Sequence, residues 1–137
     1  MLATAIQIPR KITNQLLHFA QLSPHLEICG LIGSLDGEPC HCYPVSNCAE
    51  RPENRFQLDP QEQITAFSQM RERGERLFAI YHSHPGAPAI PSPTDLALAA
   101  YPQALTLIIS LNTKGVLEMR GYRIADQKAQ EITLSLG

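Results

Sequence analysis

Two histidines, a serine and an aspartate lie close together in the chain, in the order His82, His84, Ser92 and Asp95. The histidines follow the apolar run 77–81, which is typical of a buried strand. Alternate residues of a strand point to the same face, so the two imidazoles can converge while the residue between them points away. Two imidazoles and a carboxylate suit zinc and leave a fourth position open for water. The pattern is therefore compatible with a catalytic zinc site.

Ser92 and Asp95 also have a purely structural interpretation. Ser-Pro-Thr-Asp is a helix capping box, with Ser92 at the N-cap, Pro93 in the first helical position and Asp95 in the third. A carboxylate that turns back to cap its own helix is not expected to point freely at a metal. A histidine at the end of a strand is also commonly a structural residue. The local sequence leaves both interpretations open.

Glu27 is the candidate for the base that a hydrolytic zinc site needs. On its own, a glutamate ahead of a buried strand is usually just solvated. Zinc lowers the pKa of its bound water to about 7, and a nearby glutamate can then take the proton and pass it to the leaving amine. Glu27 precedes the apolar run 28–35, which places it at the start of a predicted strand.

The elements that must position these residues follow from hydrophobic periodicity and turn signals. Asp36-Gly37 and the turn at 112–115 predict antiparallel strand pairs, so the expected fold class is α/β, with a mixed sheet and helices against its faces. The predicted helices cover 12–22, 59–73 and 92 to about 101; the predicted strands cover 4–8, 28–35, 40–45, 56–58, 77–81, 105–111, 116–124 and 131–136.

Composition narrows the class of protein. The chain has 137 residues, 44% of them hydrophobic and 18% charged, which predicts one globular domain over 1–137 and excludes a disordered chain or a coiled coil. A net charge of -2 argues against a nucleic-acid binder. No apolar run approaches the ~20 residues that span a bilayer. With no signal peptide at the start, the expected location is cytoplasmic.

Four cysteines are the other residues that could bind a metal or form disulfides: Cys29, Cys40, Cys42 and Cys48. They contain no C-x-x-C pair, and their single C-x-C is unlike the repeats of zinc ribbons. Without a secretion signal a disulfide framework is not expected either. We expect ordinary reduced cysteines.

Taken together, the candidate residues resemble the JAMM metalloproteases, also called the MPN+ family. The family pattern is a glutamate followed by His-x-His, seven residues, Ser, two residues and Asp, and Glu27, His82, His84, Ser92 and Asp95 fill every position. The resemblance extends over about residues 1–125. The H-x-E and P-C-x-x-C motifs of the zinc deaminases are missing, so a deaminase is not expected.

The resemblance implies a fold and a set of roles. The fold would be a cytidine-deaminase-like MPN sandwich, in which helices flank a mixed curved sheet. His82, His84 and Asp95 would hold one Zn²⁺ with water as the fourth ligand. Glu27 would be the general acid/base, and Ser92 would help to stabilise the oxyanion. This implication favours the zinc interpretation over the capping one.

The resemblance also implies a substrate class. The chain is short, like prokaryotic members that act on ubiquitin-like sulfur-carrier proteins with a glycine-ended tail, releasing cysteine or another C-terminal extension. Segment 47–58 is the candidate wall of the groove that would take the tail. One alternative is a broader isopeptidase that removes such modifiers from lysine. A non-catalytic MPN scaffold is less favoured, because such modules typically lose zinc ligands. The oligomeric state is left open.

Overall fold

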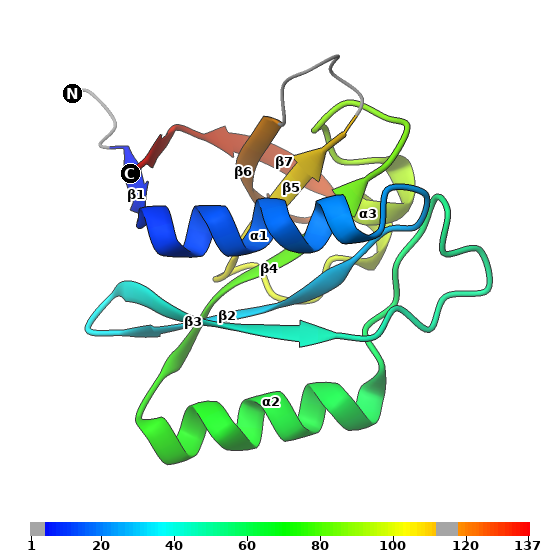
Figure 1. Ribbon diagram of the computed structural model, residues 1–137. Helices are drawn as coiled ribbons and strands as arrows, with labels where there is room; N and C mark the ends of the chain where they lie inside the picture. Colours follow the sequence, from blue (N-terminus) through cyan, green and yellow to red (C-terminus); the bar gives the residue numbers. More distant parts are fainter. Residues whose placement is uncertain (1–4, 112–117) are drawn as a thin grey trace.

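Figure 1 shows a computed structural model of the protein, which describes residues 5–111 and 118–137. The main sheet contains β2 (Cys29–Leu35), β3 (Glu38–Val45), β4 (Arg76–His84), β5 (Leu105–Ser110), β6 (Glu118–Ala125) and β7 (Lys128–Ile132). Their order across the sheet is β3-β2-β4-β5-β6-β7. The β4–β5 pair is parallel and the other pairs are antiparallel. The mixed sheet expected from the turn signals is thus confirmed.

The first helix, α1 (Arg10–Leu22), covers one face of this sheet (Figure 1). It buries Ile12, Leu16 and Ala20, which recur at helical spacing and join the larger hydrophobic core. Tyr81 of β4 belongs to the same core. Ala79 belongs to this core too, so the odd-numbered residues next to Tyr81, Ala79 and Ser83, lie on the α1 side of the sheet.

The second helix, α2 (Pro60–Arg73), lies on the opposite face (Figure 1). The side chain of Asp59 caps it by accepting the N–H of Glu62, and Gly74 ends it in a left-handed conformation with φ 73°. Ala66 and Met70 are its buried residues. Both helix ends lie where the cap residues predicted them.

The hairpin between β2 and β3 also follows the sequence. Asp36 and Gly37 both have positive φ, 50° and 82°, as a two-residue type I′ turn requires. Strands β2 and β3 pair back antiparallel from this turn.

The predicted single strand over 131–136 is wrong, because the chain makes two strands there. β7 ends at Ile132, and β8 (Leu134–Leu136) pairs in parallel with β1 (Ile6–Ile8) in a separate two-stranded sheet. The carbonyl of Thr133, between β7 and β8, accepts the N–H of Ile6. Pairing with the start of the chain therefore redirects the last residues out of the main sheet.

Two further predictions need correction. Helix α3 (Pro93–Leu98) ends three residues before Tyr101, because Ala99 is extended and Pro102 disfavours a helical Tyr101. The predicted strand over 56–58 is reduced to an isolated bridge between Leu58 and Asn47.

Some predictions concern residues outside the described ranges: the start of the first strand at Thr4, the turn at 112–115 and the start of the strand at 116. All four cysteines are free thiols, as expected. Among residues 5–111 and 118–137, no helix has the length and apolar character needed to cross a membrane. The cytoplasmic location stays a prediction.

Candidate metal centre

The last residues of β4 carry the histidine pair. His82 and His84 are buried and point to the face of the sheet opposite α1. Ser83 points the other way, and its hydroxyl oxygen accepts the N–H of Ile28 at 2.9 Å. The alternation predicted from the strand pattern is therefore present, and the Ser83 bond ties the end of β4 to the residue that follows Glu27.

Asp95 completes a compact triangle of donor atoms. Nε2 of His82 and Nε2 of His84 are 3.1 Å apart, and each is 3.2 Å from Oδ2 of Asp95. Zinc bonds to nitrogen and oxygen measure about 2.0–2.2 Å, so adjacent ligands of a tetrahedral ion lie about 3.3 Å apart. Two nitrogens and one oxygen at these separations fit three corners of such a site. The donor set therefore fits a metal ion, with one position open.

The same carboxylate also caps its helix. Oδ2 of Asp95 accepts the N–H of Ser92 at 2.8 Å, while Oγ of Ser92 accepts the N–H of Asp95 at 3.0 Å. The expectation that a capping carboxylate would not point toward the histidines is wrong, whereas metal binding itself stays a prediction. An oxygen has more than one lone pair, so the bond from Ser92 fixes the direction of the carboxylate and leaves it facing the histidines.

A short irregular loop fixes the orientation of His84. Its Nδ1 lies 2.7 Å from the carbonyl oxygen of Pro88, which can only accept, so Nδ1 carries the proton and Nε2 is free to bind a metal. Ser110 and Tyr122 donate hydrogen bonds to the two neighbouring carbonyls of the same loop, those of Ala87 and Ala89. Residues of the sheet therefore hold the loop that orients the imidazole of His84.

His82 is held by stacking. The ring of Phe56 lies over its imidazole, with centroids 4.3 Å apart and planes 19° from parallel. The Nδ1 atom of His82 is buried and has no hydrogen-bond partner among the described residues. Phe56 is not among the residues predicted for the site, and its place in the predicted groove wall, 47–58, is the signal that could have indicated it.

Glu27 is buried beside the histidines, so the ordinary solvated interpretation is wrong. Donor atoms of Glu27, His82 and His84 all lie within 4.8 Å of one another. Oε1 of Glu27 is buried and has no hydrogen-bond partner among the described residues. Burial raises its pKa to about 7, close to the value expected of a general base that works at neutral pH.

The pKa shifts of the three residues show which of them carries a charge in the metal-free protein. Burial lowers the pKa of His82. Burial opposes charge on Asp95 too, but its hydrogen bonds with His82 and His84 outweigh this and hold its pKa far below the ordinary range. Burial likewise opposes protonation of His84, yet the bond to Asp95 brings a net rise in its pKa. Asp95 is therefore an anion, as a metal ligand should be.

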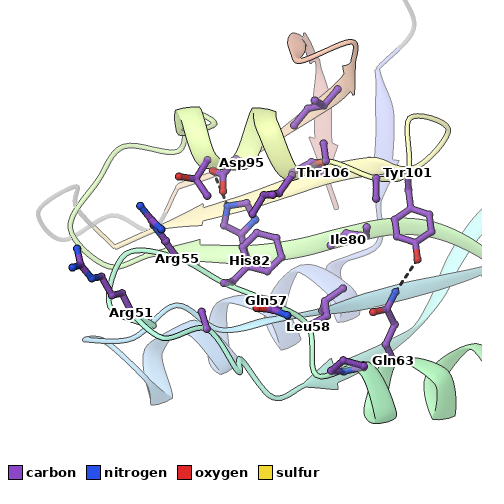
Figure 2. Close-up of a pocket in the computed structure, with 18 of the residues that line it drawn as sticks. Arg51, Arg55, Gln57, Leu58, Gln63, Ile80, His82, Asp95, Tyr101 and Thr106 are labelled. Atoms are coloured by element: carbon purple, nitrogen blue, oxygen red, sulfur yellow. Dashed lines mark hydrogen bonds and ion pairs between the residues drawn. The ribbon is translucent and has the colours of Figure 1, made fainter.

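A pocket of about 740 Å³ opens beside His82 and Asp95 (Figure 2). The loop before α2 forms one wall through Ala49, Glu50, Arg51, Arg55, Phe56, Gln57 and Leu58, which lie within the predicted segment 47–58. At the far end from Asp95, Nε2 of Gln63 donates to the hydroxyl of Tyr101 at 2.8 Å. The arrangement can hold a metal, supply a buried carboxyl group and admit an extended substrate.

Solved structures with the same fold place the protein in a structural class. A JAB1/MPN domain protein from Archaeoglobus fulgidus matches with a TM-score of 0.62 and 17% identity, covering 98% of this chain and 99% of that one. A protein from Desulfitobacterium hafniense, solved in solution, matches with a TM-score of 0.85 and 33% identity, covering 96% and 92%. The fold is that of the MPN domains, as the family resemblance implied.

Sequence comparison gives the family. Residues 9–124 match the family described as prokaryotic homologs of the JAB domain, and the chain belongs to this family. The CysO-cysteine peptidase of Mycobacterium tuberculosis is 33% identical over 122 residues, 88% of this chain and 83% of that protein. The desampylase of Haloferax volcanii is 35% identical over 89 residues, 64% of each chain. A probable TtuB-protein conjugate cleaving protease of Thermus thermophilus is 30% identical over 82 residues, 60% of this chain and 55% of that one.

Proposed function

We propose that this protein is a zinc-dependent peptidase that cleaves after the C-terminal glycine of ubiquitin-like sulfur-carrier proteins. The observation that carries the proposal is the convergence of two imidazole nitrogens and a carboxylate oxygen, each 3.1–3.2 Å from the others. Beside them lies Glu27, whose buried Oε1 has no hydrogen-bond partner among the described residues. One domain spanning residues 1–137 would carry the reaction.

His82, His84 and Asp95 would hold the metal, which would supply a Lewis acid and lower the pKa of a water molecule. Glu27 takes a proton from the attacking water and returns it to the leaving amine. Ser92 uses its hydroxyl oxygen to accept the N–H of Asp95, so its own proton is free to stabilise the oxyanion that forms at the carbonyl.

The substrate class follows from the relatives and the shape of the site. One relative is named for CysO-cysteine and another for TtuB-protein conjugates, and the family resemblance implies glycine-ended tails. An extended tail fits the pocket beside His82, with Phe56 stacked over that ligand. Glycines at the tail end approach the buried donors without a side-chain clash.

Cleavage of lysine isopeptide bonds is the second candidate. The names of the desampylase and the TtuB-conjugate protease favour it, because both describe removal of a protein modifier. A carrier joined to a C-terminal cysteine and the same carrier joined to a lysine side chain separate the two activities in one assay.

The test is cleavage of a panel of Gly-Gly-ended carriers that includes CysO and TtuB, each bearing a C-terminal cysteine. We expect the zinc-loaded protein to release cysteine, chelation to abolish the activity and zinc to restore it. The matched variant Glu27→Gln should bind zinc normally and lose most turnover. Failure to cut any carrier would overturn the proposal and favour a non-catalytic MPN scaffold. Undiminished cleavage after chelation would overturn the zinc dependence of the peptidase.

A further inference from the structure

Two arginines stand at one end of the pocket without partners. Arg51 and Arg55 line the pocket and are exposed, and Figure 2 shows both on the side of Asp95, away from Tyr101. Within the described residues, neither guanidinium forms an ion pair or a hydrogen bond, although Glu50 lines the same pocket. Two forked donors next to the candidate metal centre are therefore available to a ligand.

The loop that carries these arginines is built to hold its shape. Oδ1 of Asn47 accepts the N–H groups of Ala49 and Gln57, both at 3.0 Å. Its Nδ2 donates to the carbonyls of Glu27 at 3.0 Å and Arg55 at 2.9 Å. One side chain therefore connects the backbone of Arg55 to that of the candidate base, and the loop needs little ordering when a ligand binds.

The two ends of the pocket differ in charge. Arg55 directly precedes Phe56, whose ring stacks on His82, and both residues line the pocket. Figure 2 shows Arg55 on the same side of His82 as Asp95. Beyond His82 the lining includes Leu58 and Ile80, and the pocket ends at uncharged Tyr101. A substrate lying across His82 would place an uncharged segment on one side and an anionic group on the other.

We propose that Arg51 and Arg55 bind the free α-carboxylate of the amino acid released from the carrier. This inference rests on the proposed function and specifies its leaving group. When a single residue follows the scissile glycine, its carboxylate lies about 3.5 Å of chain from the bond that breaks. Arginine binds carboxylates through two parallel hydrogen bonds, which fixes the leaving group beside the metal. A lysine isopeptide places only an alkyl chain at this position.

The experiment compares two substrates made on a carrier that the zinc-loaded protein cleaves. One carries a C-terminal cysteine with a free carboxylate, and the other carries the same cysteine as a carboxamide. We expect kcat/KM to be about 10- to 100-fold higher for the carboxylate, as for loss of a charged hydrogen bond. The lysine isopeptide of the same carrier should resemble the carboxamide.

Substitutions then test whether Arg51 and Arg55 cause the preference for the carboxylate substrate. Arg55→Gln and Arg51→Gln should each reduce the carboxylate-to-carboxamide ratio, and the double variant should bring it close to one. The matched control is Arg71→Gln, which removes an exposed arginine in the last turn of α2, outside the pocket lining, and should keep the wild-type ratio. Far-ultraviolet circular dichroism of each variant checks that the loop changes leave the fold intact.

The possible results distinguish failure of the arginine assignment from failure of the proposed peptidase function. Equal cleavage of carboxylate and carboxamide by the wild type overturns the arginine assignment and leaves the peptidase in place. A preference that survives in the double variant also overturns it, since another group must then bind the carboxylate. If no carrier is cleaved at all, the proposed function itself has failed.

Discussion

At the residue scale, Asp95 combines a helix cap with a position beside the histidine pair. Its Oδ2 atom accepts the N–H of Ser92 and also faces Nε2 of both histidines. The capping bond restricts the carboxylate to the orientation that the donor triangle needs. Local structure therefore prepares the site, and the two interpretations that the sequence left open turn out to describe the same geometry.

Substituting Asp95 by asparagine separates capping from metal binding. The amide oxygen of Asp95→Asn can still accept the N–H of Ser92, but it is a neutral ligand, so we expect zinc affinity to fall at least 10- to 100-fold. Calorimetric titration with Zn²⁺ measures the loss. The complementary variant, Ser92→Ala, removes the hydroxyl that caps the helix, so it should be about 1 kcal/mol less stable. It should keep most of its zinc affinity, because the three candidate ligands remain. Unchanged zinc affinity in Asp95→Asn would remove Asp95 from the ligand set.

Glu27 should make the metal-free protein less stable as the pH rises. Burial raises its pKa from 4.5 to about 7, so the folded protein holds a proton between these values that the unfolded chain has released. Stability is therefore lost as the pH rises through this window, by about 1–3 kcal/mol at pH 8. Glu27→Gln has no such proton to lose. Urea unfolding in the presence of a chelator measures this. Between pH 5 and pH 8, the free energy of unfolding of Glu27→Gln should rise relative to that of the wild type. A pH-independent difference would contradict this.

At the element scale, the loop between β3 and α2 depends on one side chain. Asn47 makes four hydrogen bonds to backbone groups, two as acceptor and two as donor. These bonds replace the sheet ladder that the predicted strand over 56–58 would have formed, and they leave only the bridge from Asn47 to Leu58. The groove wall is therefore ordered by a side chain, without being a strand.

Removing this side chain should loosen the groove while leaving the metal ligands in place. We expect Asn47→Ala to cost about 1–2 kcal/mol, since four backbone groups lose their partner at once, and to raise KM more than it lowers kcat. Asn47→Asp is the matched control, because it keeps the acceptor atom for Ala49 and Gln57 and loses only the donors. Hydrogen exchange at those two amides should accelerate in the alanine variant and stay closer to wild type in the aspartate variant. Equal exchange in all three proteins would contradict the role of Asn47.

Some elements could be predicted and others could not, for physical reasons. Helix α2 is specified by its own residues: Asp59 caps it and Gly74 ends it. The pairing of β8 with β1 joins chain ends more than 120 residues apart, and no local pattern encodes such a partner. The candidate metal ligands could be predicted from the spacing of residue types in 82–95. The contact of Phe56 could not be predicted, because its stacking on His82 depends on the path of a loop.

At the scale of the whole molecule, a hydrogen-bond network around the buried carboxylate of Glu75 lies at the opposite end of β4 from the candidate metal centre. Glu75 immediately precedes that strand, and its carboxylate accepts from the hydroxyl of Tyr43 at 2.7 Å and contacts Nδ1 of His41 at 2.5 Å. Gly33 makes room for it, since a Cβ there would lie 2.1 Å from Oε1 of Glu75. Cys40 has its sulfur in the same cluster. These contacts leave the carboxylate well satisfied, so we treat the network as structural.

Glu75 should therefore govern acid stability. Burial alone would raise its pKa, but the hydrogen bonds from Tyr43 and His41 outweigh it and bring the pKa of Glu75 below its ordinary value. For a lowered pKa, the stabilisation is present above the unfolded value and is lost as the pH falls through the folded one. Glu75→Gln should thus be about 1.5–3 kcal/mol less stable than wild type at pH 7, with the gap narrowing below about pH 4.

Urea unfolding at pH 7 and pH 3.5 measures this, with Glu72→Gln as the matched control, because Glu72 is exposed on the neighbouring turn of α2. We expect the control to stay within about 0.5 kcal/mol of wild type at both pH values. A gap for Glu75→Gln that is the same at both pH values would mean that the carboxylate contributes through shape alone. Zinc affinity should not change in either variant, since the extended chain from Glu75 to His84 spans roughly 30 Å.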